Sequence, residues 1–276
     1  MRAVVPQKPI FLLQNNYFDQ IGRLIQPCLD FCNKHDHQFI DRSLTETFDP
    51  EKIGVDWNAV PGVVIYGSVG WVKRCADSAL APWTFYDRHR FAATSWAPAF
   101  GKNALNGNGE VQTVSEITRR LERGERVHIR PNRDDKAFNG AVYDIASWEN
   151  MLKLRQERHQ TLPDSQLECW ASPVKEIEAE YRCWFIDNVL INVSMYRNKG
   201  ELCLKRETSH EVLKAATDLA AQHLPISTIV MDIAKTQDGY KVVEFNPINS
   251  SGWYAAATET ILSRWCEAIM MKANTI

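Results

Sequence analysis

The chain has 276 residues, of which 45% are hydrophobic and 24% are charged, and its formal net charge is −2. These are the values of an ordinary globular protein, with enough length for one large domain or for two to three small ones. A nucleic-acid partner is disfavoured because no basic excess is present. No apolar run approaches the roughly 18–20 residues of a membrane span, and the first residues lack the apolar core of a signal peptide. We therefore expect a cytoplasmic protein with no membrane partner.

Seven cysteines are scattered along the chain, and Cys28 and Cys32 lie four residues apart on one predicted helical face. A metal site there would need two more ligands. His35 and His37 are near in sequence, but no Cys-x-x-Cys pair supports such a site. Core packing of reduced thiols is therefore favoured over metal binding.

The first third of the chain alternates predicted strands with a helix. Apolar runs predict strands over residues 9–13, 38–40 and 62–66, and apolar residues at helical spacing predict a helix over residues 17–34. This rhythm indicates a small open α/β layer. Residues 67–70, Gly-Ser-Val-Gly, lack the Gly-Lys-Ser/Thr ending of a P-loop, so a strand-to-helix turn is favoured over a substrate loop.

The middle of the chain begins with a Gly- and Asn-rich stretch, residues 97–112, which is typical of a linker. Residues 113–116, Thr-Val-Ser-Glu, form a capping box and predict a short helix that ends at Gly124. The pattern then predicts, in order, a strand at 127–131, a polar loop at 132–140, extended structure at 141–143 and a helix at 147–160.

Two β-hairpins are predicted in the last third. The first spans residues 178–197 and turns at Asp187-Asn188, and the second spans residues 230–247 and turns around Asp238. An amphipathic helix over residues 209–223 separates them, and a helix over residues 254–271 follows.

The second hairpin carries a candidate metal site. With the turn centred on Asp238, Asp232 lies directly across from Glu244, and strand alternation puts Asn246 on the face of Glu244. Met231, Ile233, Val243 and Phe245 then face the core. Two carboxylates facing each other across a ladder repel, and a divalent cation would remove that penalty. Magnesium suits such an oxygen set when phosphate oxygens complete it; a half-exposed hairpin with incidental acids is the alternative.

Positively charged side chains that could bind phosphate lie on the loop at 132–140 and on the strand before it. Arg130 ends that strand and Lys136 lies on the loop, an arrangement with which a protein lacking a P-loop can cover a triphosphate. A charged surface loop is the alternative. His128 shares the strand face of Arg130, and we expect a partly buried histidine rather than a ligand there.

The first hairpin places Glu180, Arg182 and Trp184 on one face, which Met195 and Arg197 of the partner strand join. Arginines beside an aromatic ring fit anion recognition, and a cross-strand Glu/Arg ladder is the alternative. Residues 246–253 carry amide and hydroxyl groups that fit either an anion-binding loop or an ordinary strand-to-helix connection.

The order of these pieces resembles the ATP-grasp superfamily and, more narrowly, its R2K clade, named for two arginines and a lysine. The resemblance covers roughly residues 95–276. Its motifs are Arg-Pro (130–131), Asp-Asp-Lys-Ala-Phe-Asn-Gly (134–140), Glu-Ile-Glu-Ala-Glu-Tyr-Arg (176–182), Met-Asp-Ile (231–233) and Val-Glu-Phe-Asn-Pro (243–247). One departure is Arg130, which stands where a strand lysine is usual in the superfamily.

The resemblance implies an α/β (α+β) protein with the ATP-grasp fold, in which two α+β subdomains enclose ATP behind a small open α/β layer. The implied domains are residues 1–94, the N-terminal layer; residues 95–170, the small subdomain; and residues 171–276, the C-terminal subdomain with the metal site. A phage-encoded relative would act in the cytoplasm of its bacterial host.

The resemblance also assigns roles to residues. Arg130, Lys136 and Arg182 match the catalytic, phosphate-contacting set, and the hinge that holds adenine and ribose falls at Ser172–Glu176. The positions assigned to nucleotide binding are Arg130, Lys136, Ser172, Val174, Glu176, Glu180, Arg182 and Asn246. The Mg2+ ligands are Asp232, Glu244 and Asn246.

The implied activity is that of an ADP-forming ligase, which uses ATP and Mg2+ to join a carboxylate to an amine or thiol through an acylphosphate. The carboxylate is that of a small molecule or a peptide. A phosphotransferase on the same fold and a non-catalytic ATP-binding module are the alternatives. The sequence does not indicate the oligomeric state.

Overall fold

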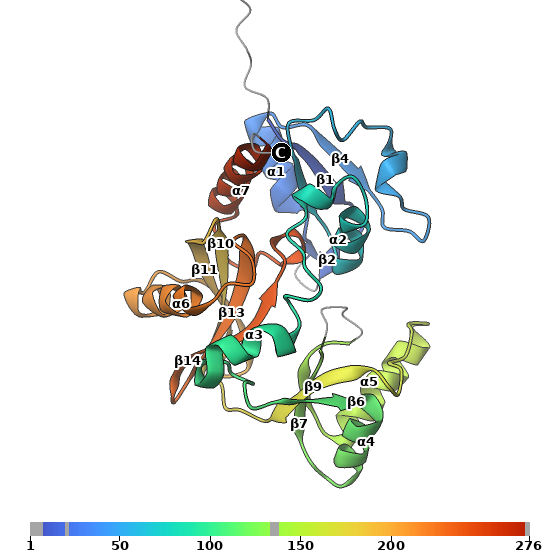
Figure 1. Cartoon of the computed structure of the whole chain (residues 1–276), viewed down its shortest axis with the longest axis vertical. Helices are drawn as coiled ribbons and strands as arrows, with labels where there is room; N and C mark the ends of the chain where they lie inside the picture. Colours follow the sequence, from blue (N-terminus) through green and yellow to red (C-terminus); the bar gives the residue numbers. More distant parts are fainter. Residues whose placement is uncertain (1–7, 20–21, 133–137, 274–276) are drawn as a thin grey trace, which may run out of the picture.

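A computed structural model describes residues 8–19, 22–132 and 138–273 of the chain. Three groups of strands and helices follow one another from the top to the bottom of Figure 1. The group with the five-stranded sheet lies between the group with the three-stranded sheet and the group with the four-stranded sheet. No helix in these ranges has both the length and the apolar character that crossing a membrane requires.

The N-terminal layer is a parallel sheet with the strand order β4-β1-β5. Its strands are β1 (Ile10–Gln14), β4 (Phe39–Arg42) and β5 (Val63–Tyr66). Helices α1 (Gln26–His35), α2 (Val69–Ala76) and α7 (Thr258–Ala273) accompany it. The predicted open α/β layer is therefore confirmed, and the C-terminal helix returns to pack against α1 and β5 (Figure 1).

The predicted helix over residues 17–34 begins too early. Strands β2 (Phe18–Asp19) and β3 (Gly22–Arg23) form a small hairpin first, and α1 starts only at Gln26. Pro27 lies in the first turn of α1, where its missing N–H costs no helical hydrogen bond. The predicted strand-to-helix turn at residues 67–70 is confirmed, with the Ser68 hydroxyl accepting a hydrogen bond from Trp71 N.

Cys28 and Cys32 lie on the buried face of α1, in the core that the N-terminal layer shares with α7. Cys266 of α7 joins them, and burial raises the pKa of the Cys32 and Cys266 thiols to about 12. All seven cysteines are free, as the composition predicted.

The lower sheet in Figure 1 is antiparallel with the strand order β6-β9-β7-β8. Its strands are β6 (Glu110–Thr113), β7 (Val127–Pro131), β8 (Ala141–Tyr143) and β9 (Glu168–Pro173). Helices α4 (Val114–Glu122) and α5 (Ile145–Glu157) cover one face and bury Ile117, Leu121 and Trp148 against it. The capping box of Thr113 and Glu116 is present as predicted.

The central sheet is antiparallel with the strand order β12-β11-β10-β13-β14. Its strands are β10 (Ala179–Ile186), β11 (Val189–Asn198), β12 (Glu201–Arg206), β13 (Ile229–Thr236) and β14 (Gly239–Asn246). Helices α3 (Ala93–Phe100) and α6 (His210–Gln222) pack on one face. Residues 93–100 are thus helical, although the Gly- and Asn-rich composition just after them predicted a linker from residue 97. Further 3-10 helices lie at Pro50–Ile53, Ala81–Trp83, Gly101–Asn103 and Ile248–Ser250.

The other face of the central sheet is divided along β10. Trp184 and Ile186 at one end are buried in the core shared with the N-terminal layer, whereas Glu180 and Arg182 at the other end line a cavity. Side chains two residues apart on a strand share a face. The same face therefore serves as core at one end and as an open site at the other.

The loop between β14 and α7 fastens the N-terminal layer to this sheet. The fully buried Asn249 donates from Nδ2 to the carbonyl of Ile65 (2.9 Å), and its Oδ1 accepts from the N–H of Phe85 (2.7 Å). The Tyr66 hydroxyl donates to the carbonyl of Ser251 (2.9 Å). Of the two interpretations of residues 246–253, these contacts favour the structural connection.

Candidate functional site

The hairpin of β13 and β14 brings the predicted metal ligands together. Asp232 pairs directly with Glu244, and Val230 pairs with Asn246, so Glu244 and Asn246 lie two residues apart on one strand face. The turn consists of Gln237 and Asp238, between the paired residues Thr236 and Gly239. The predicted opposition of Asp232 and Glu244 is confirmed.

A β-bulge completes this register. Ile233 pairs with Val242 rather than with Val243, so one extra residue is inserted beside the acidic pair. Val242 is buried in the core and Val243 lines the cavity. The expectation that Val243 faces the core was wrong, because a sequence pattern does not reveal where a bulge interrupts the alternation.

The hairpin of β10 and β11 turns at Asp187 and Asn188 as predicted. Both residues have positive φ angles, 50° and 64°, as a two-residue turn of type I′ requires. A bulge lies here too, since Glu180 pairs with Arg197 but Tyr181 pairs with Met195. Met195 consequently packs against the opposite core, and Tyr196 instead of Met195 lines the cavity.

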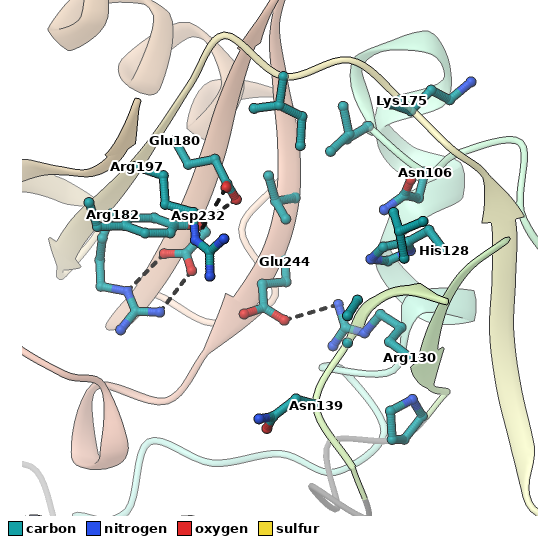
Figure 2. A pocket seen from close by; sticks show the side chains of 18 of the residues that line it. Asn106, His128, Arg130, Asn139, Lys175, Glu180, Arg182, Arg197, Asp232 and Glu244 are labelled. Atoms are coloured by element: carbon teal, nitrogen blue, oxygen red, sulfur yellow. Dashed lines mark hydrogen bonds and ion pairs between the residues drawn. The ribbon is translucent and has the colours of Figure 1, made fainter. Parts of the chain in front are cut away.

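A cavity of about 590 Å³ lies between the central sheet and the lower sheet (Figure 2). The lower sheet contributes His128 and Arg130 from β7 and Val142 from β8. The central sheet contributes Glu180, Arg182, Tyr196, Arg197, Asp232 and Glu244. Further polar groups come from Asn106, which precedes β6, from Asn139 and Lys175, and from Tyr254 in the loop before α7.

Each carboxylate of the acidic pair faces an arginine. Arg182 donates from Nε and Nη2 to the two oxygens of Asp232, at 2.9 and 2.8 Å. Arg130, from the lower sheet, reaches across the cavity, with its Nη1 3.3 Å from Oε2 of Glu244. Asn246 donates from Nδ2 to Oε1 of Glu244 (3.0 Å). The arginines therefore offset the carboxylate repulsion that the sequence indicated.

The chemistry of this set fits Mg2+. An ionised carboxylate has about four acceptor sites, so a bidentate pair with Arg182 is compatible with coordination of a cation by Asp232. The described ranges contain no group of three His, Cys, Asp or Glu side chains with metal-ligand geometry. Two carboxylates and one amide therefore suit a cation whose remaining ligands are water and phosphate oxygens.

Two tyrosines that sequence reasoning missed surround Arg182. Tyr254 stacks on Tyr196 with ring centroids 5.0 Å apart, and the Arg182 guanidinium carbon lies 4.7 Å from the Tyr254 centroid. The Tyr196 hydroxyl donates to Oε2 of Glu180 (2.9 Å). Burial, together with the nearby charges of Asp232 and Glu244, raises the pKa of the Glu180 carboxyl despite this bond. No sequence signal marked Tyr196, because the bulge that turns it inward is not visible in the pattern.

The remaining predicted residues lie around the cavity at different depths. Ser172 is buried on β9, and its hydroxyl lies 3.3 Å from Nδ1 of His128. Val174 is exposed, and Glu176 lines a second cavity of about 830 Å³ that shares Lys175 with the first. Asn246 is buried behind Glu244. Lys136 lies outside the described residues.

His128 is a partly buried strand histidine, as predicted, and it lines the cavity. Burial, with a further contribution from Arg130, lowers its pKa from 6.5 to about 4. Because the pKa of His128 is lower in the folded state, the unfolded chain binds more protons than the folded chain between pH 4 and pH 6.5. The contribution of His128 to stability is therefore present above pH 6.5 and is lost as the pH falls towards 4.

The variant His128→Gln is expected to show a weaker acid dependence than the wild type. Its free energy of unfolding should fall less between pH 7 and pH 4, by up to about 3 kcal/mol. Urea denaturation across this range measures the difference. His210→Gln, at an exposed position on α6, serves as the matched substitution control. Parallel curves for His128→Gln and wild type would contradict the buried, neutral state of His128.

Comparisons with known proteins agree with this architecture. The D-alanine–D-alanine ligase of Bacillus anthracis complexed with ATP has a TM-score of 0.57 at 14% identity, over 97% of this chain and 98% of that chain. The D-cycloserine synthetase DcsG has a TM-score of 0.55 at 14% identity, over 96% and 99%. A RimK domain ATP-grasp protein from Sphaerobacter thermophilus has a TM-score of 0.53 at 13% identity, over 96% and 98%. At these identities the likeness shows the fold, which is the predicted ATP-grasp fold.

A search of curated proteins finds no match to this chain. The family model described as "ATP-grasp domain, R2K clade family 3" matches residues 69–265, which include α2, both hairpins and the first half of α7. The match begins at residue 69, whereas the motifs of the sequence resemblance lie after residue 95. The chain therefore belongs to the ATP-grasp family, in family 3 of its R2K clade.

Proposed function

We propose that this protein is an ATP- and Mg2+-dependent ligase that joins a carboxylate to an amine, or to a thiol, through an acylphosphate. The observation that carries the proposal is the row of Asp232, Glu244 and Asn246 on one face of the β13–β14 hairpin, opposite Arg130 across the cavity. Membership of the ATP-grasp family supports it. The cavity between two sheets offers room for a nucleotide.

In this proposal Asp232, Glu244 and Asn246 hold Mg2+, and Arg130 and Lys136 contact the phosphates. Mg2+ supplies charge neutralisation at the β- and γ-phosphates of ATP. The hinge positions Ser172, Val174 and Glu176, with Glu180, form the adenine and ribose end. The proposed domains are residues 1–94, 95–170 and 171–276.

The chemistry needs little from the protein beyond positioning and charge. A substrate carboxylate attacks the γ-phosphorus of ATP, which gives an acylphosphate and ADP. The amine then attacks the acyl carbon and displaces phosphate, and the proton lost by the amine passes to phosphate or water. Arg130 would balance the negative charge of the transferring group, and the enclosing sheets would limit access of water to the acylphosphate.

Small molecules and peptides are the proposed carboxylate donors. Among the similar structures, one is a D-alanine–D-alanine ligase and another is the ATP-grasp ligase PsnB complexed with a minimal precursor, at a TM-score of 0.51. The charges that line the cavity suit polar substrates, since Arg182 and Arg197 lie near Glu180.

Release of ADP from ATP tests the proposal with panels of carboxylic acids and amines. A ligase releases ADP and phosphate at a sustained rate only when an acid and a nucleophile are both present. A stable phosphorylated product without any amine would instead identify a phosphotransferase. ATP binding without turnover on the whole panel would favour a non-catalytic module.

A further inference from the structure

The two arginines that face the acidic pair differ in how many of their donors already have a partner. Arg182 donates hydrogen bonds from Nε and Nη2 to Asp232, and its Nη1 lies 3.4 Å from the carbonyl oxygen of Gly252. Arg130 makes one contact at 3.3 Å, to Glu244, and has no other partner within the described ranges. Of these two residues, Arg130 therefore has the larger part of its guanidinium available for a ligand.

Packing also restrains Arg182. Its guanidinium lies 4.7 Å from the ring centroid of Tyr254 and 5.8 Å from that of Tyr196, and the two rings are stacked on each other. Tyr254 adopts a φ of 51°, a left-handed conformation that residues other than glycine rarely take. A strained residue that persists beside a functional group indicates that the group is held in place for a purpose.

The sheet register explains why Arg182 meets Asp232. Strand β10 lies next to β13 in the sheet, and Arg182 pairs directly with Asp232, which in turn pairs with Glu244. Arg182, Asp232 and Glu244 thus form one row across three strands, with Asp232 in the middle (Figure 2). The arginine is at the end of the row that lies away from Glu244 and Arg130.

We infer that Arg182 is a positioning residue, which orients Asp232 for the cation and does not contact the phosphates, and that Arg130 is the arginine that binds them. This inference rests on the proposed function. It assigns different roles to Arg130 and Arg182, to which the family resemblance gives the same role. A carboxylate held in a bidentate fork presents its remaining acceptor sites in one fixed direction. Hydrogen-bond partners of metal ligands typically contribute 10- to 100-fold to metal affinity.

The test uses two matched, charge-neutral double variants of the full chain, each of which removes one arginine with its carboxylate. These are Arg182→Met/Asp232→Asn and Arg130→Met/Glu244→Gln. Removing both partners avoids leaving the buried Asp232 carboxylate without its arginine, as the single variant Arg182→Met would. Isothermal titration calorimetry measures the affinity for ADP, first in EDTA and then with Mg2+. The ratio of the two affinities gives the increase that the metal causes.

For Arg182→Met/Asp232→Asn we expect an ADP affinity in EDTA within about threefold of wild type and a loss of at least tenfold in the increase caused by Mg2+. For Arg130→Met/Glu244→Gln we expect the affinity in EDTA itself to fall by at least tenfold. Arg182→Lys, which keeps the charge but loses the fork, should behave like the first double variant in both measurements.

The inference would be overturned if, in EDTA, the Arg182 variants lost as much ADP affinity as the Arg130 variant, or more. Arg182 would then contact phosphate. An undiminished effect of Mg2+ in Arg182→Lys would also overturn it. Failure of the wild type to bind ADP under either condition would overturn the proposed function itself, and the inference with it. Circular dichroism melting curves establish that each variant is folded.

Discussion

The substitution Glu244→Gln is expected to lower turnover by roughly 10³-fold while leaving the fold cooperative. Glu244 accepts a hydrogen bond from Asn246 and faces Arg130, and it stands beside Asp232 in the proposed metal site. A neutral amide is a much weaker ligand for Mg2+ and leaves the Arg130 charge without its partner. Release of ADP, with an acid and amine pair that the wild type accepts, measures the loss.

Glu211→Gln is the matched control for this variant. Glu211 lies on α6 and accepts hydrogen bonds from Tyr240 and Lys235 of the same β13–β14 hairpin, at the protein surface. Its removal should leave turnover within about twofold of wild type, since exposed pairs of this kind contribute little. Turnover retained in Glu244→Gln, or lost equally in both variants, would argue against the metal assignment.

The substitution Asn249→Ala is expected to lower the free energy of unfolding by about 3 kcal/mol. Asn249 is fully buried, and its side chain satisfies the carbonyl of Ile65 and the N–H of Phe85. Alanine leaves the buried carbonyl of Ile65 and the half-buried N–H of Phe85 without this partner and opens a small cavity. Urea denaturation measures the change.

The surface residue Asn103 supplies the control for this stability prediction. Its Nδ2 donates to Gln222 (3.1 Å) near solvent, so Asn103→Ala should change the free energy of unfolding by no more than about 0.5 kcal/mol. A loss below about 1 kcal/mol in Asn249→Ala would mean that water replaces the buried bonds. The loop after β14 would then not fasten the N-terminal layer.

Local patterns predicted the elements of the site well. Alternation and turn residues led to the prediction that Asp232 pairs with Glu244 and that a hairpin turns at Asp187-Asn188, and both are observed. Even so, the predicted register at Asp232 holds for a reason that the pattern did not contain. With a two-residue turn and regular pairing, Asp232 would lie opposite Val243. The bulge at Val243 moves the pairing by one residue, so that Asp232 lies opposite Glu244. A bulge depends on tertiary packing, so Val243 and Met195 were assigned to the wrong faces.

Contacts between elements distant in the sequence were not predictable in this way. The Arg182–Asp232 pair exists because β10 lies beside β13, although β11, β12 and α6 intervene in the chain. The Arg130–Glu244 contact requires two different sheets to face each other. Tyr254 reaches Arg182 from a loop whose path the N-terminal layer determines through Asn249. Long-range packing therefore decides the partners of residues whose identity the sequence already suggested.

A crystal structure of the chain soaked with ADP and Mg2+ tests the central claim most directly. The account predicts one metal ion bound by oxygens of Asp232, Glu244 and Asn246 at about 2.1 Å, and the guanidinium of Arg130 against the phosphates. A metal ion or diphosphate bound elsewhere, with these carboxylates still paired with their arginines, would contradict it.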